Sequence, residues 1–346
     1  DAYQSGDMHD WSVWHGRVPF SEYEKHFPRF MTEYGFQSFP EMRTVEAFTV
    51  PEDRTSIFTP VMLAHQKNNA GNSIIHDYML RYYSEPKDFA SFLYASQVLQ
   101  AEGIKIGAEH LRRDRPRTMG SIFWQLNDCW PVASWSSLDY YGRWKALQYY
   151  ARRFYNDLLV SPHEENGSIA VYVVSDRTTP TSANLRLRLM NFDGTILREE
   201  SRVVEVPPLS SQVDLRWPKA ELPKTFDPAG AFLAADLTVG GQPVSSNLLF
   251  FAAPKELRLP AAPISSSLER VGDSYRLRLV CPDLARSVSI SFTGSEAELS
   301  DDYFDLLPGR SVEVAVKSPE SQEKLRAGLK IVSLVDAFQS AAPGHP

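Results

Sequence analysis

Two short apolar segments separated by one long helical segment restrict the fold of this chain more than any other feature. The first, residues 29–34 (RFMTEY), stops at a glycine turn, and the second covers residues 120–128 (GSIFWQLND). Between them, residues 86–113 carry apolar side chains near helical spacing, with Asp88 at the end that favours negative charge. A strand, a long helix and a second strand form the repeat of a (β/α)₈ TIM barrel. We therefore expect residues 1–159 to form the C-terminal part of such a barrel, with its last two strands and helices.

One carboxylate, Glu33, lies at the end of the first predicted strand, directly before Tyr34 and a glycine. In a barrel of alternating strands and helices, catalytic side chains emerge at the C-terminal ends of the strands. Aromatic neighbours would exclude water there and strengthen the effect of the charge. The alternative is a solvated carboxylate paired with Arg29 or Arg43, which residue type alone favours.

Aromatic side chains are concentrated in the same part of the chain. Five of the seven tryptophans precede residue 136. In the segment 1–28, which has the composition of a loop, four ring side chains fall close together: His9, Trp11, Trp14 and His15. Indole rings pack well against the C–H faces of sugars, so the cluster indicates a carbohydrate site. The alternative is a large aromatic core, and for Trp14 and His9 packing on the barrel rim has equal weight.

Further candidates follow at the end of the second predicted strand. Trp124 would lie beside Glu33 at the C-terminal end of that strand, where we favour a role in a site over a structural core residue. Asn127 and Asp128 could bond sugar hydroxyls or hold the following loop. For both we rank the loop-holding role first.

The second half of the chain changes to a period of two. A final helix of the first module is predicted within residues 136–158, and Pro162 and the turn at 164–167 mark its boundary. Alternating apolar positions then recur, at Leu185, Leu187 and Leu189 and again at Tyr275, Leu277 and Leu279. We expect two immunoglobulin-like β-sandwiches, over residues 160–259 and 260–346.

Composition excludes several classes of function. The net charge of −7 gives no electrostatic support for nucleic-acid binding. No apolar run approaches the roughly 20 residues that span a bilayer. The two cysteines, Cys129 and Cys281, fall in different predicted modules, so we expect no disulfide between them. Neither they nor the histidines show a zinc-site spacing, and we expect no metal and no cofactor.

Several long motifs resemble the retaining β-mannosidases of glycoside hydrolase family 2. They are RFMTEYGFQSFP (29–40), GDMHDWSVWHG (6–16), GSIFWQLNDCWP (120–131) and DDYFDLLPG (301–309). The resemblance therefore covers nearly the whole chain and implies a β-mannoside substrate. It also implies that Glu33 is the catalytic nucleophile.

The resemblance further implies how the sugar is held. It assigns the loop that contains His9 and Trp14 to the wall of the sugar pocket. Trp11 and His15 would lie nearest the reactive centre, and Trp124 would form the platform under the sugar.

The general acid/base of that family is a glutamate that follows an asparagine on an earlier barrel strand, and no Gly-Asn-Glu-type motif precedes Glu33. We therefore expect this chain to be the C-terminal piece of a longer enzyme. The N-terminal portion of the same enzyme would supply the acid/base, the first six barrel strands and any N-terminal β-domains. Two barrel strands alone would leave exposed edges, and we expect no glycosidase activity from the chain by itself.

Other functions remain open. Exo-β-glucosaminidases and β-galactosidases share the layout, although the GDMHDWSVWHG and EYGFQS runs favour a mannosidase. We expect an exo-β-mannosidase, and endo-acting cleavage is the alternative that depends on whether the pocket is blind. From a different class, the chain could be a non-catalytic carbohydrate-binding or adhesion module. That alternative accounts for residues 160–346 but gives Glu33 and the aromatic cluster no purpose.

Overall fold

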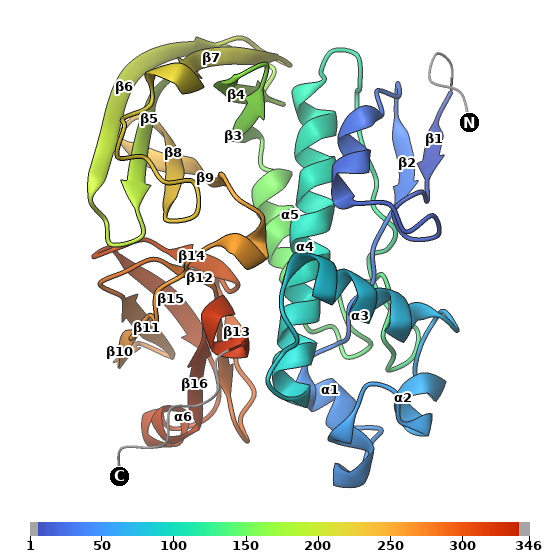
Figure 1. Cartoon of the computed structure of the whole chain (residues 1–346). Helices are drawn as coiled ribbons and strands as arrows, with labels where there is room; N and C mark the ends of the chain where they lie inside the picture. The colour runs from blue at the N-terminus through green and yellow to red at the C-terminus, as the bar shows by residue number, and fades with distance from the viewer. Residues whose placement is uncertain (1–5, 339–346) are drawn as a thin grey trace.

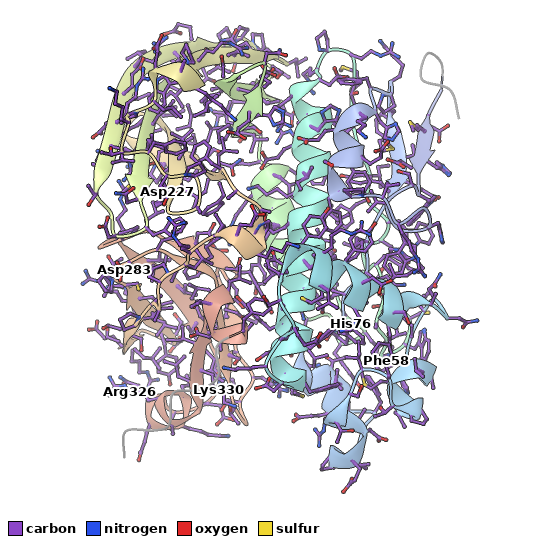
Figure 2. All side chains as sticks on the ribbon, viewed as in Figure 1. Phe58, His76, Asp227, Asp283, Arg326 and Lys330 are labelled. Carbon is purple, nitrogen blue, oxygen red and sulfur yellow. The ribbon has the colours of Figure 1, made fainter. Side chains whose placement is uncertain are left out.

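The computed structural model describes residues 6–338, which form three modules around one long helix, α4 (Phe89–Arg113; Figure 1). The predicted helix over 86–113 is confirmed. Asp88 is its N-cap, and its carboxylate accepts a hydrogen bond from the Ser91 N–H at 2.7 Å. Side chains fill both sides of α4, with Phe58 and His76 on one side and Asp227 and Asp283 of the sandwiches on the other (Figure 2).

The first module contains three parallel extended segments. Strand β1 (Met8–Asp10) pairs with β2 (Met31–Tyr34), and residues 120–124 run along the other side of β2. The last of these segments forms one bridge, at Ser121, and is not a regular strand. We predicted two strands here and a loop over residues 1–28. That prediction is wrong for β1, because a strand of three residues is too short to show a period in the sequence.

Short helices and one further long helix cover these segments. They are η1 (Phe20–Lys25), α1 (Met42–Glu46), η2 (Pro51–Thr55), α2 (Pro60–Ala64), α3 (Gly71–Tyr82) and α5 (Ala146–Phe154). The predicted final helix within 136–158 is α5. No helix of residues 6–338 is both long and apolar enough to cross a membrane.

Two glycines in α4 let η1 pack closely against the helix. A Cβ atom on Gly103 would overlap the ring of Phe20, which is 2% exposed. On Gly107 the nearest atoms, in Tyr34 and Tyr23, would lie 3.1 to 3.3 Å away. The glycines therefore lower helix propensity but permit contact with the buried rings.

Replacing Gly103 by Ala should destabilise the protein by roughly 1–3 kcal/mol, because overpacking against Phe20 outweighs the gain in helix propensity. Denaturant unfolding measures this change. The matched variant Gly107→Ala meets a looser contact and should cost less. Equal stabilities of Gly103→Ala and the unmodified chain would mean that Phe20 shifts freely.

The first sandwich begins two residues before the predicted boundary. Its sheets have the orders β3–β4–β7 and β6–β5–β8–β9. Their strands are β3 (Leu158–Glu165), β4 (Ser168–Ser175), β5 (Thr181–Asn191), β6 (Ile196–Val206), β7 (Ser211–Pro218), β8 (Ala231–Val239) and β9 (Gln242–Phe250). The boundary at 159/160 thus falls inside β3. Pro162 and the turn at 164–167 belong to the β3–β4 hairpin, where Asn166 and Gly167 have the positive φ angles of a tight hairpin turn.

The last module also contains two sheets, of orders β10–β11–β15–β13 and β14–β12–β16. Its elements are β10 (Ser265–Val271), β11 (Ser274–Val280), β12 (Ala285–Phe292), β13 (Glu298–Leu299), β14 (Phe304–Leu306), β15 (Ser311–Lys317), α6 (Gln322–Gly328), β16 (Leu329–Val332) and η5 (Leu334–Ala337). The predicted alternation is confirmed in both sandwiches, since Leu187 and Leu277 are fully buried. Residues 339–346 lie outside the described part of the chain.

Candidate active site

Glu33 lies at the C-terminal end of β2, in register with His9 on β1. Its side chain is 30% exposed, and its Oε2 atom accepts a hydrogen bond from Trp11 Nε1 at 3.1 Å. His9 Nδ1 lies 3.5 Å from the same oxygen. Neither Arg29 nor Arg43 forms an ion pair with Glu33 within residues 6–338, and Arg43 pairs instead with Glu296 at 2.7 Å. The alternative of a strand-end carboxylate paired with arginine is therefore not what the structure contains.

His9 bridges two carboxylates. Its Nε2 atom lies 3.5 Å from Asp7 Oδ2, opposite the contact of Nδ1 with Glu33. Asp7 also accepts a hydrogen bond from the Thr32 hydroxyl at 2.6 Å, which lowers the pKa of the Asp7 carboxyl. The imidazole is 44% exposed, so it is oriented by its neighbours and still open to a ligand.

The predicted loop aromatics divide into an open group and a buried one. The half-buried Trp11 ring lies edge-on to Trp135, with centroids 5.9 Å apart, and 5.5 Å from the exposed His15 ring. Trp14 is fully buried and packs edge-on against Phe36 and Trp135. The assignment of Trp14 to substrate contact is therefore corrected, because a side chain enclosed by the core offers no surface to a sugar.

Trp124 emerges from the segment beside β2. Its N–H donates to the Tyr34 carbonyl at 2.8 Å, and its side chain is 44% exposed. Trp124 is therefore not a core tryptophan, which was the alternative. Gly35 explains how the two segments approach one another, since a Cβ atom there would lie 2.5 Å from the Trp124 carbonyl oxygen.

Asp128 holds the loop that follows Trp124, as predicted. It is 6% exposed, and its Oδ2 atom accepts hydrogen bonds from Ser134 Oγ at 2.8 Å and Ser136 Oγ at 2.6 Å. Asn127 is exposed, and its backbone forms the bridge to Leu138. This backbone bridge is consistent with the loop-holding role that we ranked first for Asn127.

Buried polar residues behind the site were not predicted. Gln100 of α4 and Lys145, just before α5, are 0% and 2% exposed. Burial lowers the pKa of Lys145 to about 8, although Asp128 and Asp139 act in the opposite direction. No functional residue is predicted on the α4 helix. The available signal was the polar Gln97 and Gln100 on its apolar face, where burial requires specific hydrogen bonds.

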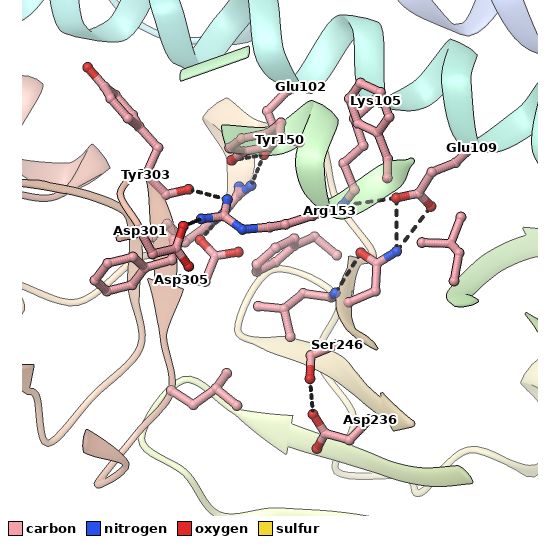
Figure 3. Close-up of a pocket in the computed structure, with 18 residues that line it drawn as sticks. Glu102, Lys105, Glu109, Tyr150, Arg153, Asp236, Ser246, Asp301, Tyr303 and Asp305 are labelled. Atoms are coloured by element: carbon pink, nitrogen blue, oxygen red, sulfur yellow. Dashed lines mark hydrogen bonds and ion pairs between the residues drawn. The ribbon is translucent and has the colours of Figure 1, made fainter. Parts of the chain in front are cut away.

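A cavity of about 280 Å³ lies where the three modules meet, and Glu33 is not among the residues that line it (Figure 3). Several of its polar side chains pair with one another. Tyr150 donates to Glu102 at 2.9 Å, and Arg153 pairs with Asp301 at 2.6 Å. We therefore interpret the cavity as part of the interface between modules. Within residues 6–338, no group of three or more His, Cys, Asp or Glu side chains is arranged to hold a metal ion.

Comparisons with known proteins point most consistently to β-mannosidases. Residues 167–256 match the Mannosidase Ig/CBM-like domain, and residues 259–337 match an Ig-fold domain. β-Mannosidase B of Aspergillus niger is 27% identical over 93% of this chain and 40% of its own length. The crystal structure of the Dictyoglomus thermophilum β-D-mannosidase superposes with a TM-score of 0.88 and 29% identity, over 96% of this chain and 40% of that one. This chain is a homologue of β-mannosidases.

The chain spans about 40% of the length of these β-mannosidase relatives and corresponds to their C-terminal portion. The Amycolatopsis orientalis exo-chitosanase CsxA shares the fold, with a TM-score of 0.71 at 16% identity over 98% of this chain and 45% of that one. The immunoglobulin-like assignment of both sandwiches is confirmed by the two matching domain families.

Proposed function

We propose that this chain provides the nucleophile, Glu33, of a retaining exo-β-mannosidase that removes terminal non-reducing β-D-mannose from β-mannosides and manno-oligosaccharides. The observation that carries the proposal is the hydrogen bond from Trp11 to a carboxylate at the end of a parallel strand. Similarity to β-mannosidases supports the same sugar. In this proposal the three parallel segments belong to a (β/α)₈ barrel.

Glu33 has the contacts that a nucleophilic carboxylate requires. Trp11 and His9 both approach Oε2, which leaves Oε1 available for attack. The indole N–H donates a hydrogen bond that orients the carboxylate. Trp124, His15 and His9 would contact the sugar ring or its hydroxyls, and Trp11 would hold the carboxylate while forming part of the pocket wall.

Hydrolysis with retention proceeds in two displacements between carboxyl groups about 5 Å apart. Oε1 of Glu33 forms a bond to the anomeric carbon while the bond to the leaving oxygen breaks, and a second carboxyl group gives that oxygen a proton. The same second group then takes a proton from water. The water oxygen bonds to the anomeric carbon and Glu33 leaves as a carboxylate.

The second carboxyl group would come from the N-terminal portion of the same enzyme, together with the remaining barrel strands. Exposed apolar side chains in and next to the 120–124 segment support this partner. Met119, Ile122 and Leu126 are 48%, 56% and 57% exposed. An uncovered strand with such side chains is a surface on which another strand can pair.

The enzyme assembled from this chain and that N-terminal portion should cleave an aryl β-mannoside at least about 100-fold faster than the aryl β-glucoside. The two sugars differ only in the hydroxyl at C2, and a site that hydrogen-bonds one arrangement leaves polar groups unpaired with the other. NMR of the first-formed sugar should show the β-anomer. Equal cleavage of both glycosides would remove the mannosidase assignment, and turnover by this chain alone would remove the need for the second segment.

A further inference from the structure

Gln100, in the middle of α4, uses both ends of its buried side-chain amide to hold two loops. Its Nε2 atom donates to the carbonyl oxygens of Phe36 at 2.8 Å and Trp135 at 3.1 Å. Its Oε1 atom accepts a hydrogen bond from the Ser38 hydroxyl at 2.6 Å. A buried amide with this many partners fixes the backbone that it contacts, because each lost bond would leave a polar group unpaired.

The two loops follow the two extended segments that bear the candidate site. Residues 35–39 come after β2, and residues 133–137 come after the segment that ends at Trp124. The two loops pair with each other over a short stretch. Ser38 and Ser134 exchange two backbone hydrogen bonds, of 3.0 and 3.2 Å. Lys145 Nζ donates to the carbonyl oxygens of the same two serines at 3.2 and 3.3 Å. Gln100 and Lys145 therefore clamp the loops from behind.

The clamp reaches Glu33 through two indole rings. Gln100 holds the backbone of Trp135, and the Trp135 ring lies edge-on to Trp11. Trp11 in turn donates its hydrogen bond to Glu33. A shift of the 133–137 loop would therefore change the angle from which the Trp11 N–H approaches the carboxylate.

We propose that Gln100 is a positioning residue for Glu33: by fixing Phe36 and Trp135, it sets the orientation of the Trp11 indole that binds the carboxylate. The catalytic consequence rests on the proposed function, whereas the positioning itself does not. Displacement of a reacting group by about 1 Å can cost about 100-fold in rate. We expect a loss of that size in kcat of the assembled enzyme, with KM little changed.

The positioning can be measured in this chain without substrate. With ¹⁵N-labelled tryptophan, the Trp11 indole signal, assigned by Trp11→Phe, should shift when Glu33 is replaced by Gln, because its acceptor changes from a carboxylate to an amide. In a Gln100→Glu background this response should fall to less than half. There a carboxylate oxygen replaces the donor and faces the carbonyls of Phe36 and Trp135. Trp217 reports on folding, since its Nε1 donates to Glu200 at 2.7 Å in the first sandwich.

Two further variants make the test specific. Gln97→Glu places a carboxyl group at a neighbouring position that is 1% exposed, but Gln97 accepts a bond from the Ala146 N–H through its oxygen, which a carboxylate retains. Its Trp11 response should match that of the unmodified chain. Gln100→Asn is neutral and one methylene shorter, so it cannot span both loops and should reduce the response as Gln100→Glu does.

Three results would overturn the positioning role. The first is an unchanged Trp11 response in both Gln100 variants while the Trp217 signal shows a folded chain. The second is an equal effect of Gln97→Glu, and the third is no Trp11 shift on Glu33→Gln in the unmodified chain. Failure of the proposed function would appear elsewhere, as turnover that survives Glu33→Gln while the Trp11 response remains.

Discussion

Replacing Glu33 by Gln should reduce hydrolysis of an aryl β-mannoside by the assembled enzyme on the order of 10⁴-fold or more. An amide carries no charge and is a poor nucleophile, so the first displacement loses its attacking group. The substitution keeps the size of the side chain and an oxygen that can accept the Trp11 hydrogen bond. The loss should therefore appear in kcat, measured by release of the aryl alcohol, while sugar binding persists.

The matched control is Glu22→Gln. The Glu22 side chain is 24% exposed, close to the 30% of Glu33, but it pairs with Lys25 in an exposed i,i+3 contact of 2.7 Å. Such surface pairs contribute little, and turnover should be unchanged. Full turnover by Glu33→Gln would exclude the nucleophile assignment. Sugar binding with no turnover in the unmodified assembly would favour the alternative of a non-catalytic carbohydrate-binding module.

Between pH 4 and pH 8 the unmodified chain should lose up to about 5 kcal/mol of unfolding free energy through the Asp302 carboxyl group. The Asp302→Asn variant should not show this loss. Asp302 is 5% exposed, and burial raises the pKa of its carboxyl from 3.8 to about 8. The folded chain thus keeps a proton that the unfolded chain releases. The stability that this proton provides is complete below pH 3.8 and is lost as pH rises towards 8.

Asparagine removes this titration and keeps the acceptor for the Ile290 N–H, which lies 2.9 Å from Oδ1. The prediction concerns the difference between the two chains, because His110 and His163 act in the opposite direction. Burial lowers the pKa of each to about 4, so both add stability as pH rises from 4 to 6.5. Their effect is common to both chains and cancels.

Denaturant unfolding at several pH values provides the measurement. The control Asp273→Asn changes an exposed aspartate in the same module and should leave the pH dependence of the unmodified chain in place. Parallel pH profiles of Asp302→Asn and the unmodified chain would show that Asp302 is ionised in the folded state at neutral pH. Lys145 does not obscure the result, since its lowered pKa affects stability only between about pH 8 and 10.5.

Elements with a long period could be predicted from the sequence, and short ones could not. In helix α4 and in the alternating strands of both sandwiches, the spacing of apolar residues repeats often enough to identify the element from the sequence. Strand β1 has three residues and no readable period. The boundary before the first sandwich was displaced because Pro162 lies inside an edge strand, β3, where a missing N–H can be tolerated.

The candidate site shows a similar division. Glu33, Trp11 and Trp124 stand in long motifs, and the structure brings Glu33 and Trp11 into contact. The burial of Trp14 could not be foreseen, because a ring cluster in one loop does not reveal which rings face inwards. Gln100 was missed for a related reason. Its partners are backbone carbonyl groups of loops distant in sequence. Every residue has a carbonyl group, so the amino-acid sequence does not indicate which of them Gln100 contacts.

Helix α4 forms hydrogen bonds with a different sandwich at each of its two ends. Just before its N-cap, the Lys87 N–H donates to the Ala337 carbonyl of the last module at 2.9 Å. At its last residue, Arg113 donates to Ser161 and accepts from Ser211 of the first sandwich, both at 2.9 Å. Twenty-five residues correspond to a rod of roughly 37 Å. One inserted residue would turn one sandwich about 100° around the helix axis relative to the other. The number of residues between Asp88 and Arg113 therefore sets the spacing and the relative rotation of the two sandwiches.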